Sequence, residues 1–164
     1  MKEEFPDLEK LNILVMKYKI VNSELTISYL TLLLMSQKIM GKTESFLNKF
    51  NITNTQLSIM LLLYMNKANH ETLSSISGKL GLSSPGISKV LNTLHKKDFI
   101  IKKENLNDRR CKYISLSKKG EDVLNVIIPE YRLKYEKFLS DFTFEELKNL
   151  KDMVLKLFFK LDSF

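Results

Sequence analysis

Small, hydroxyl-bearing and basic side chains gather in the middle of the chain, where they could donate hydrogen bonds to phosphates and base edges. Residues 83–97 have helical apolar spacing, and the positions between the apolar ones include Ser, Gly, Asn and Lys. A pair of arginines follows in a polar turn. The predicted DNA-contacting residues are Ser83, Ser84, Pro85, Gly86, Ser88, Lys89, Asn92, Lys96, Asp108, Arg109, Arg110 and Lys112.

The net positive charge of the chain is concentrated in this region. Residues 79–119 contain 11 Lys or Arg and 3 Asp or Glu, which is a net charge of +8. The whole chain of 164 residues has a net charge of +7, so the other 123 residues together carry −1. A basic charge concentrated in one segment indicates a contact surface for a polyanion such as nucleic acid.

Motifs typical of enzymes and metal centres do not occur. The sequence has no Gly-x-Ser-x-Gly, no His-Glu-x-x-His and no Gly-rich phosphate loop. His70 and His95 are not at ligand spacing from Cys or carboxylates, so we expect no metal, no cofactor and no enzymatic activity. The single cysteine, Cys111, excludes an intramolecular disulfide and suggests a reducing compartment. Basic neighbours would favour its thiolate, but without a resolving cysteine we interpret it as a strand residue.

Two short helices are predicted to position the basic and hydroxyl-bearing residues. Thr72 can cap the first helix, and Gly81 allows the left-handed turn that ends it. Ser83 or Ser84 can cap the second helix, which runs to residue 97 with Pro85 in its first turn. This order is that of a helix-turn-helix, whose second helix fits the major groove of DNA.

A hairpin is predicted directly after the second helix. Residues 99–103 and 111–116 read as strands, the second with period-two alternation, and residues 105–110 form a loop long enough to project as a wing. Leu82, in the turn between the two helices, is expected to fill the core. The sequence therefore predicts helix, turn, helix, strand, basic loop and strand.

Long apolar helical segments flank this unit on both sides. The first helical pattern loosens near residues 21–23 and is predicted to stop at Gly41, whereas capping boxes at Thr53 and Thr143 open later helices. The flanking helices carry more apolar surface than they can bury locally, which favours packing on a second subunit. The apolar run 25–35 is too short to span a membrane, and no secretory signal is visible, so a cytoplasmic location is expected.

These parts resemble the MarR family of winged-helix transcription regulators. The resemblance implies a mainly α fold with a small β-hairpin wing, a winged helix-turn-helix flanked by N- and C-terminal dimerisation helices. It implies a homodimer on a palindromic operator, often a repressor that a small ligand or an oxidant releases. The residues that carry it are Thr53-x-x-Gln56, Leu82-Ser83 with Ser88-Lys89-x-Leu91-x2-Leu94, Phe99-Ile100, Asp108-Arg109-Arg110 and Leu116-Ser117-x2-Gly120.

Further expectations follow from the resemblance. Three segments are predicted: residues 1–45 for dimerisation, 46–119 for DNA binding and 120–164 for dimerisation. One of Arg109 and Arg110 would enter the minor groove at the wing tip while Asp108 orients the other. Asp98 stands where the family usually has Gly, so a strained or differently shaped turn into the wing is expected. A small-molecule effector would bind among Met16, Tyr18, Tyr29, Met60 and Tyr64.

Two alternatives remain open at this point. The winged unit could dock a protein, with its basic surface incidental, or it could coat DNA in the manner of a nucleoid protein without an operator. Absence of binding to random duplex DNA at low salt would favour the protein-docking module over a DNA-binding regulator. Footprinting would distinguish the regulator from a DNA-coating protein, because only the regulator protects one discrete palindrome.

Overall fold

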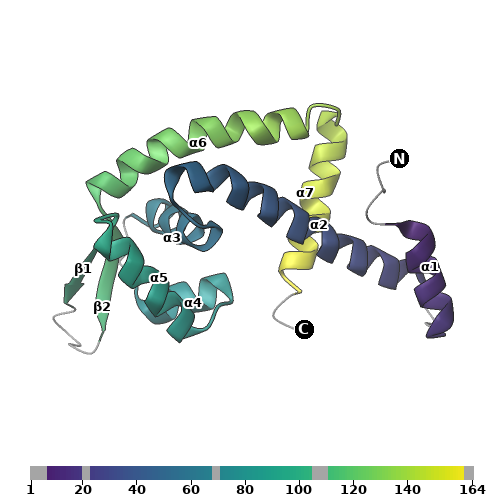
Figure 1. Cartoon of the computed structure of the whole chain (residues 1–164), viewed down its shortest axis with the longest axis horizontal. Helices are drawn as coiled ribbons and strands as arrows, with labels where there is room; N and C mark the ends of the chain where they lie inside the picture. Colours follow the sequence, from purple (N-terminus) through teal and green to yellow (C-terminus); the bar gives the residue numbers. More distant parts are fainter. Residues whose placement is uncertain (1–6, 20–22, 68–70, 105–110, 161–164) are drawn as a thin grey trace. The chain divides into compact units, whose positions relative to one another are not determined.

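The computed structural model describes residues 7–19, 23–67, 71–104 and 111–160 (Figure 1). These parts are mainly helical with one two-stranded antiparallel sheet, so the predicted fold class is confirmed. The chain divides into two compact units, Met1–Ser117 and Lys118–Phe164. The elements are α1 (Leu8–Lys17), α2 (Ser23–Leu47), η1 (Asn48–Phe50), α3 (Asn54–Met65), α4 (Leu73–Leu80), α5 (Ser84–Lys96), β1 (Ile100–Glu104), β2 (Lys112–Leu116), α6 (Lys118–Phe138) and α7 (Phe144–Phe158).

Two helices open the first unit. Asp7 caps α1, its Oδ1 accepting hydrogen bonds from the amides of Glu9 and Lys10 at 3.1 Å each. The next helix, α2, continues through Gly41 to its end at Leu47, so the predicted stop at Gly41 is wrong. Residues beyond that glycine are buried, notably Thr43 and Leu47. Their packing outweighs the helix-propensity cost of one glycine, which is about 1 kcal/mol.

The core of the first unit is built around α3. The predicted capping box is confirmed: Thr53 Oγ1 accepts from the Gln56 amide at 3.2 Å, and the Thr53 amide donates to Gln56 Oε1 at 3.3 Å. Apolar side chains then occur all round the helix, as expected of an element covered on several sides. Its contacts with α2, α4, α5 and β2 explain why Leu57, Ile59, Met60 and Leu63 are buried.

The two helices α4 and α5 form the predicted helix-turn-helix. Thr72 caps α4 by accepting a hydrogen bond from the Ser75 amide at 3.3 Å, and Gly81 ends it with a φ of 62°. Leu82 is 45% exposed, so the prediction that it fills the core is wrong. Ile76 and Ile87, from the two helices, are fully buried and occupy that core without it. The sequence pattern of the turn could not reveal that these two side chains would fill the core in place of Leu82.

The hairpin that follows α5 has the predicted antiparallel order. Its register pairs Ile100 with Leu116 and Glu104 with Lys112. The first strand begins one residue later than predicted because the Phe99 amide still donates to the Leu94 carbonyl of α5, at 3.0 Å. On the other edge of β2, the Ile114 amide donates to the Glu71 carbonyl at 2.7 Å.

The turn between α5 and β1 has the expected strain. Asp98 adopts a φ of 60°, a left-handed conformation that glycine adopts more readily than any other residue. Its carbonyl accepts a hydrogen bond from the Ser117 hydroxyl at 2.5 Å, and the Ser117 amide donates to the Phe99 carbonyl at 3.0 Å. These bonds join the start of β1 to the end of β2 and fix the base of the hairpin.

The second unit contains α6 and α7. Pro129 lies inside α6, and the predicted Thr143 capping box that opens α7 is confirmed by a 3.3 Å bond from the Glu146 amide to Thr143 Oγ1. Apolar side chains along α7, including Val154 and Leu157, are exposed. Within the described ranges, no helix is both long and apolar enough to cross a membrane.

Candidate nucleic-acid interface

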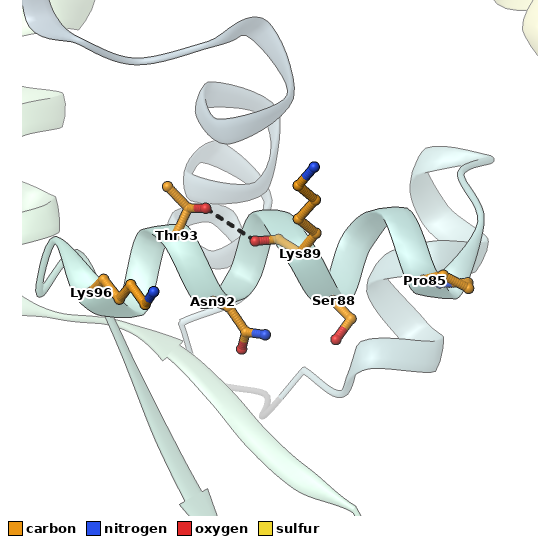
Figure 2. A pocket seen from close by; sticks show the side chains of 6 residues that line it. All are labelled: Pro85, Ser88, Lys89, Asn92, Thr93 and Lys96. Atoms are coloured by element: carbon orange, nitrogen blue, oxygen red, sulfur yellow. Dashed lines mark hydrogen bonds between the residues drawn. The ribbon is translucent and has the colours of Figure 1, made fainter.

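The candidate interface is the outer face of α5. Its inner face is fixed by Ile87, Leu91 and Leu94, which are at most 2% exposed. Helical periodicity then turns the intervening polar residues outward. An open pocket lies along this outer face (Figure 2), lined by Pro85, Ser88, Lys89, Asn92, Thr93 and Lys96.

Five of the six pocket residues were predicted as DNA contacts, and Thr93 was not. Thr93 lies one helical turn after Lys89, and its hydroxyl donates to the Lys89 carbonyl at 3.1 Å (Figure 2). That four-residue spacing was the available signal, since residues four apart share a helix face. Figure 2 shows Ser88 and Asn92 pointing to one side of α5 and Lys89 and Thr93 to another.

The N-terminal turn of α5 is exposed from Ser83 to Gly86. Ser83 occupies the N-cap position, but its side chain makes no capping hydrogen bond, so the predicted cap is present in position only. A Cβ at Gly86 would come within 3.2 Å of Ser83 Oγ. Small residues here leave the backbone amides of the turn accessible, and the positive end of a helix dipole favours anions.

A lysine of the hairpin is hydrogen-bonded to the outer face of α5, the predicted recognition helix. Lys102 Nζ, from β1, donates to Oδ1 of Asn92 at 2.7 Å. Burial, and then the charge of Lys112, lowers the pKa of Lys102 below its ordinary value. Sequence periodicity could place each residue on its own element, but it could not set the distance between the two elements.

Glu71 connects α4 to the hairpin, since its backbone carbonyl bonds Ile114 of β2 and its carboxylate bonds α4. Glu71 is 3% exposed and accepts hydrogen bonds from the Ser75 hydroxyl, at 2.5 Å, and from the Lys79 ammonium. Burial raises the pKa of Glu71. The hydrogen bonds from Lys79 and Ser75 and the charge of Lys79 lower it by more, so the pKa of Glu71 lies below its ordinary value. No sequence pattern indicated this cluster, whose members lie at 71, 75 and 79.

The predicted wing contacts lie mostly outside the described residues. The structure does not describe Asp108, Arg109 and Arg110, so their assignment as DNA contacts stays a prediction. Lys112 is described, and it is exposed at the first position of β2. Cys111 precedes it and is half-buried.

The predicted effector-binding residues occupy different environments. Met60 is fully buried in α3, whereas Met16, Tyr18, Tyr29 and Tyr64 are between 43% and 78% exposed. An effector site among them stays a prediction. Among the described residues, no group of three His, Cys, Asp or Glu side chains could hold a metal ion.

Residues 42–127, more than half of the chain, match the family described as "Transcriptional regulator SarA/Rot". The chain belongs to the SarA/Rot family of transcriptional regulators. The match spans the end of α2, the whole helix-turn-helix and hairpin, and the first half of α6. It therefore includes every described residue of the candidate interface.

This SarA/Rot-family protein is similar to curated transcription regulators of Bacillus subtilis and Escherichia coli. It is 26% identical over 111 residues to the HTH-type transcriptional regulator MhqR of Bacillus subtilis, covering 68% of this chain and 75% of that protein. It is 27% identical over 129 residues to the transcriptional repressor MprA of Escherichia coli, covering 78% of this chain and 73% of that protein. Both are named as regulators of transcription and neither as an enzyme.

Solved structures confirm that the SarA/Rot-family chain has the winged-helix fold expected from the MarR resemblance. The MepR–DNA complex of S. aureus has a TM-score of 0.70 and 25% identity, covering 82% of this chain and 95% of that one. A MarR protein from Peptoclostridium difficile has a TM-score of 0.71 at 19% identity, covering 79% of this chain and 83% of that one.

Proposed function

We propose that this regulator binds double-stranded DNA sequence-specifically as a homodimer on a palindromic operator, and that it represses transcription. The observation that carries the proposal is the outer face of α5. Small, hydroxyl and cationic side chains occupy it over an apolar inner face, in the segment that holds a net charge of +8. A surface of hydrogen-bond donors and positive charge complements phosphates and base edges.

The dimensions of α5 suit the major groove. Its 13 residues span about 20 Å, and B-DNA admits one helix into a groove about 12 Å wide. The neighbouring hairpin would place Lys112 and the arginines of the wing near the backbone or the minor groove. Two copies related by a two-fold axis would present their recognition helices about 34 Å apart, one turn of DNA.

Exposed apolar side chains support the homodimer. Leu25 in α2 is 65% exposed, and Val154, Leu157 and Phe158 in α7 are 47–59% exposed. Apolar patches of this kind on helices are typical of surfaces that another subunit covers. An effector bound among the predicted pocket residues of α1, α2 and α3 would release DNA by shifting the spacing of the two recognition helices. DNA binding of this type places the protein in the cytoplasm.

The wing is tested by replacing both Arg109 and Arg110 with Ala. Each lost phosphate contact lowers the slope of log affinity against log salt by about 0.9, so weaker operator binding with a flatter salt dependence is expected. The control is the double variant Lys151→Ala and Lys156→Ala, which removes the same charge from α7. Fluorescence anisotropy with a labelled duplex measures both, and unchanged affinity and slope in the arginine variant would refute the wing assignment.

Footprinting on the DNA upstream of the protein's own gene tests the function as a whole. Protection of one discrete palindrome is the expected result. Uniform protection would identify a DNA-coating protein. A separate binding measurement with random duplex DNA at low salt covers the other alternative, since no binding there would identify a protein-docking module. Either outcome would overturn the proposal.

A further inference from the structure

We propose that Lys102 of the hairpin is a positioning residue for Asn92, and that the pair makes this regulator select guanine or thymine over adenine at one position of each half-site. The inference rests on the proposed DNA-binding function and adds a base preference to it. It starts from the bond that joins β1 to the outer face of α5.

The chemistry of the bond fixes the orientation of the Asn92 amide. An ammonium group only donates hydrogen bonds, so the amide atom 2.7 Å from Lys102 Nζ must be the oxygen. A charged donor also makes this bond stronger than a neutral one of the same geometry. The amide nitrogen of Asn92, with its two N–H donors, is left for an outside partner.

Asn92 stands where such a partner would approach. Asn92 is exposed, and it lines the open pocket on the outer face of α5 together with Ser88 and Lys96 (Figure 2). Lys102 is half-buried in β1, so the bond arises from the packing of the hairpin on α5. The hairpin thus acts on α5 as well as on the DNA that its own tip would contact.

The fixed amide alters which base fits. A free Asn side chain pairs with adenine in two bonds, donating to N7 and accepting from the N6 amino group. Here Lys102 occupies one of the two lone pairs of Asn92 Oδ1, and the positive ammonium opposes an amino group that approaches the other. The two N–H donors of Asn92 suit the acceptors instead: O6 and N7 of guanine or O4 of thymine.

The experiment is selection from a duplex library with randomised positions, followed by sequencing, for the full-length protein and five variants. Asn92→Ala identifies the position that depends on Asn92, because preference there is lost. Lys102→Met frees the amide oxygen and is expected to move preference at that same position to adenine, by about 5- to 150-fold relative to wild type. Preferences at the other positions are expected to stay.

Three variants serve as controls. Lys102→Arg keeps a charged donor and is expected to keep the wild-type base. Lys103→Met removes the neighbouring lysine of β1 and is expected to weaken binding to all sequences equally, as loss of a phosphate contact does. Asn92→Asp retains the acceptor oxygens and removes the two donors, so it is expected to lose the guanine or thymine preference.

The outcomes separate this inference from the function on which it rests. A discrete motif in which Lys102→Met weakens all sequences equally, or in which wild type selects adenine at the Asn92-dependent position, overturns the inference alone. The same holds for a motif with no position that depends on Asn92. If no motif emerges from wild-type selection, the proposed sequence-specific function is overturned, and the base preference with it.

Discussion

Gly86 shows how one residue can serve contact at the expense of stability. It lies in the first turn of α5, where glycine is a poor helix former. An added Cβ would meet only Ser83 Oγ, at 3.2 Å, which is the end of a side chain that can rotate away. The fold would therefore accept alanine here, and the glycine is better explained by the room that it leaves outside the helix.

Gly86→Ala is expected to raise the free energy of unfolding by up to about 1 kcal/mol and to weaken DNA binding. The stability gain comes from helix propensity, and the loss of affinity comes from a methyl group where the backbone would approach a phosphate. Thermal melts and anisotropy titrations measure the two effects. Gly78→Ala, inside α4 with nothing within 4 Å of its Cβ, is the control that should gain stability alone. Equal DNA affinity in both variants would contradict the contact assignment of Gly86.

At the scale of elements, the hairpin is held on the helix-turn-helix by Glu71, which precedes α4, and by Asn92 of α5. The Glu71 carbonyl bonds β2, the Glu71 carboxylate bonds Lys79 and Ser75 of α4, and Lys102 bonds Asn92 of α5. Removing one partner of a buried, hydrogen-bonded carboxylate leaves the other groups unsatisfied. Glu71 is therefore expected to affect the placement of the wing as well as stability.

Glu71→Gln is expected to lower the free energy of unfolding by about 1–3 kcal/mol at pH 7. Folding lowers the pKa of Glu71 from the 4.5 of an ordinary glutamate, so its contribution is fully present above pH 4.5. The contribution is lost as pH falls through the lower, folded-state pKa. Urea unfolding at several pH values should show the difference between wild type and variant shrinking below pH 4.5. A difference that is constant with pH would show that the carboxylate charge is not what stabilises this site.

At the scale of the whole molecule, the helices outside the winged unit carry exposed apolar side chains of the kind that a partner subunit covers. In α7 they recur at Leu150, Val154 and Leu157, the spacing of one helix face. The capping box at Thr143 fixes where this helix begins. A second copy of the chain would cover such a face in a homodimer.

Leu157→Glu is expected to shift the protein from dimer to monomer and to weaken operator binding, because a charge would enter the apolar contact. Sedimentation equilibrium at micromolar concentration measures the change, and circular dichroism confirms that helix content is kept. Lys156→Glu, which introduces the same side chain at the adjacent polar position, should remain dimeric. Wild type that sediments as a monomer would overturn the homodimer itself.

The sequence predicted much of the fold because caps and turns are local. Thr53, Thr72 and Thr143 cap helices through amides three residues away, and Gly81 makes its turn by its own φ. The predicted stop at Gly41 was wrong for a complementary reason. Local propensity favoured an end there, whereas buried contacts made by residues farther along extended α2.

The sequence by itself determined the order of elements, the apolar face of α5 and the concentration of positive charge around it, since each depends on neighbours within a few residues. Only the tertiary structure decided that Leu82 is exposed, that Glu71 is buried beside Lys79, and that Lys102 bonds Asn92. The physical reason is range. Periodicity fixes the direction of a side chain on its own element, but a bond between elements depends on how they pack.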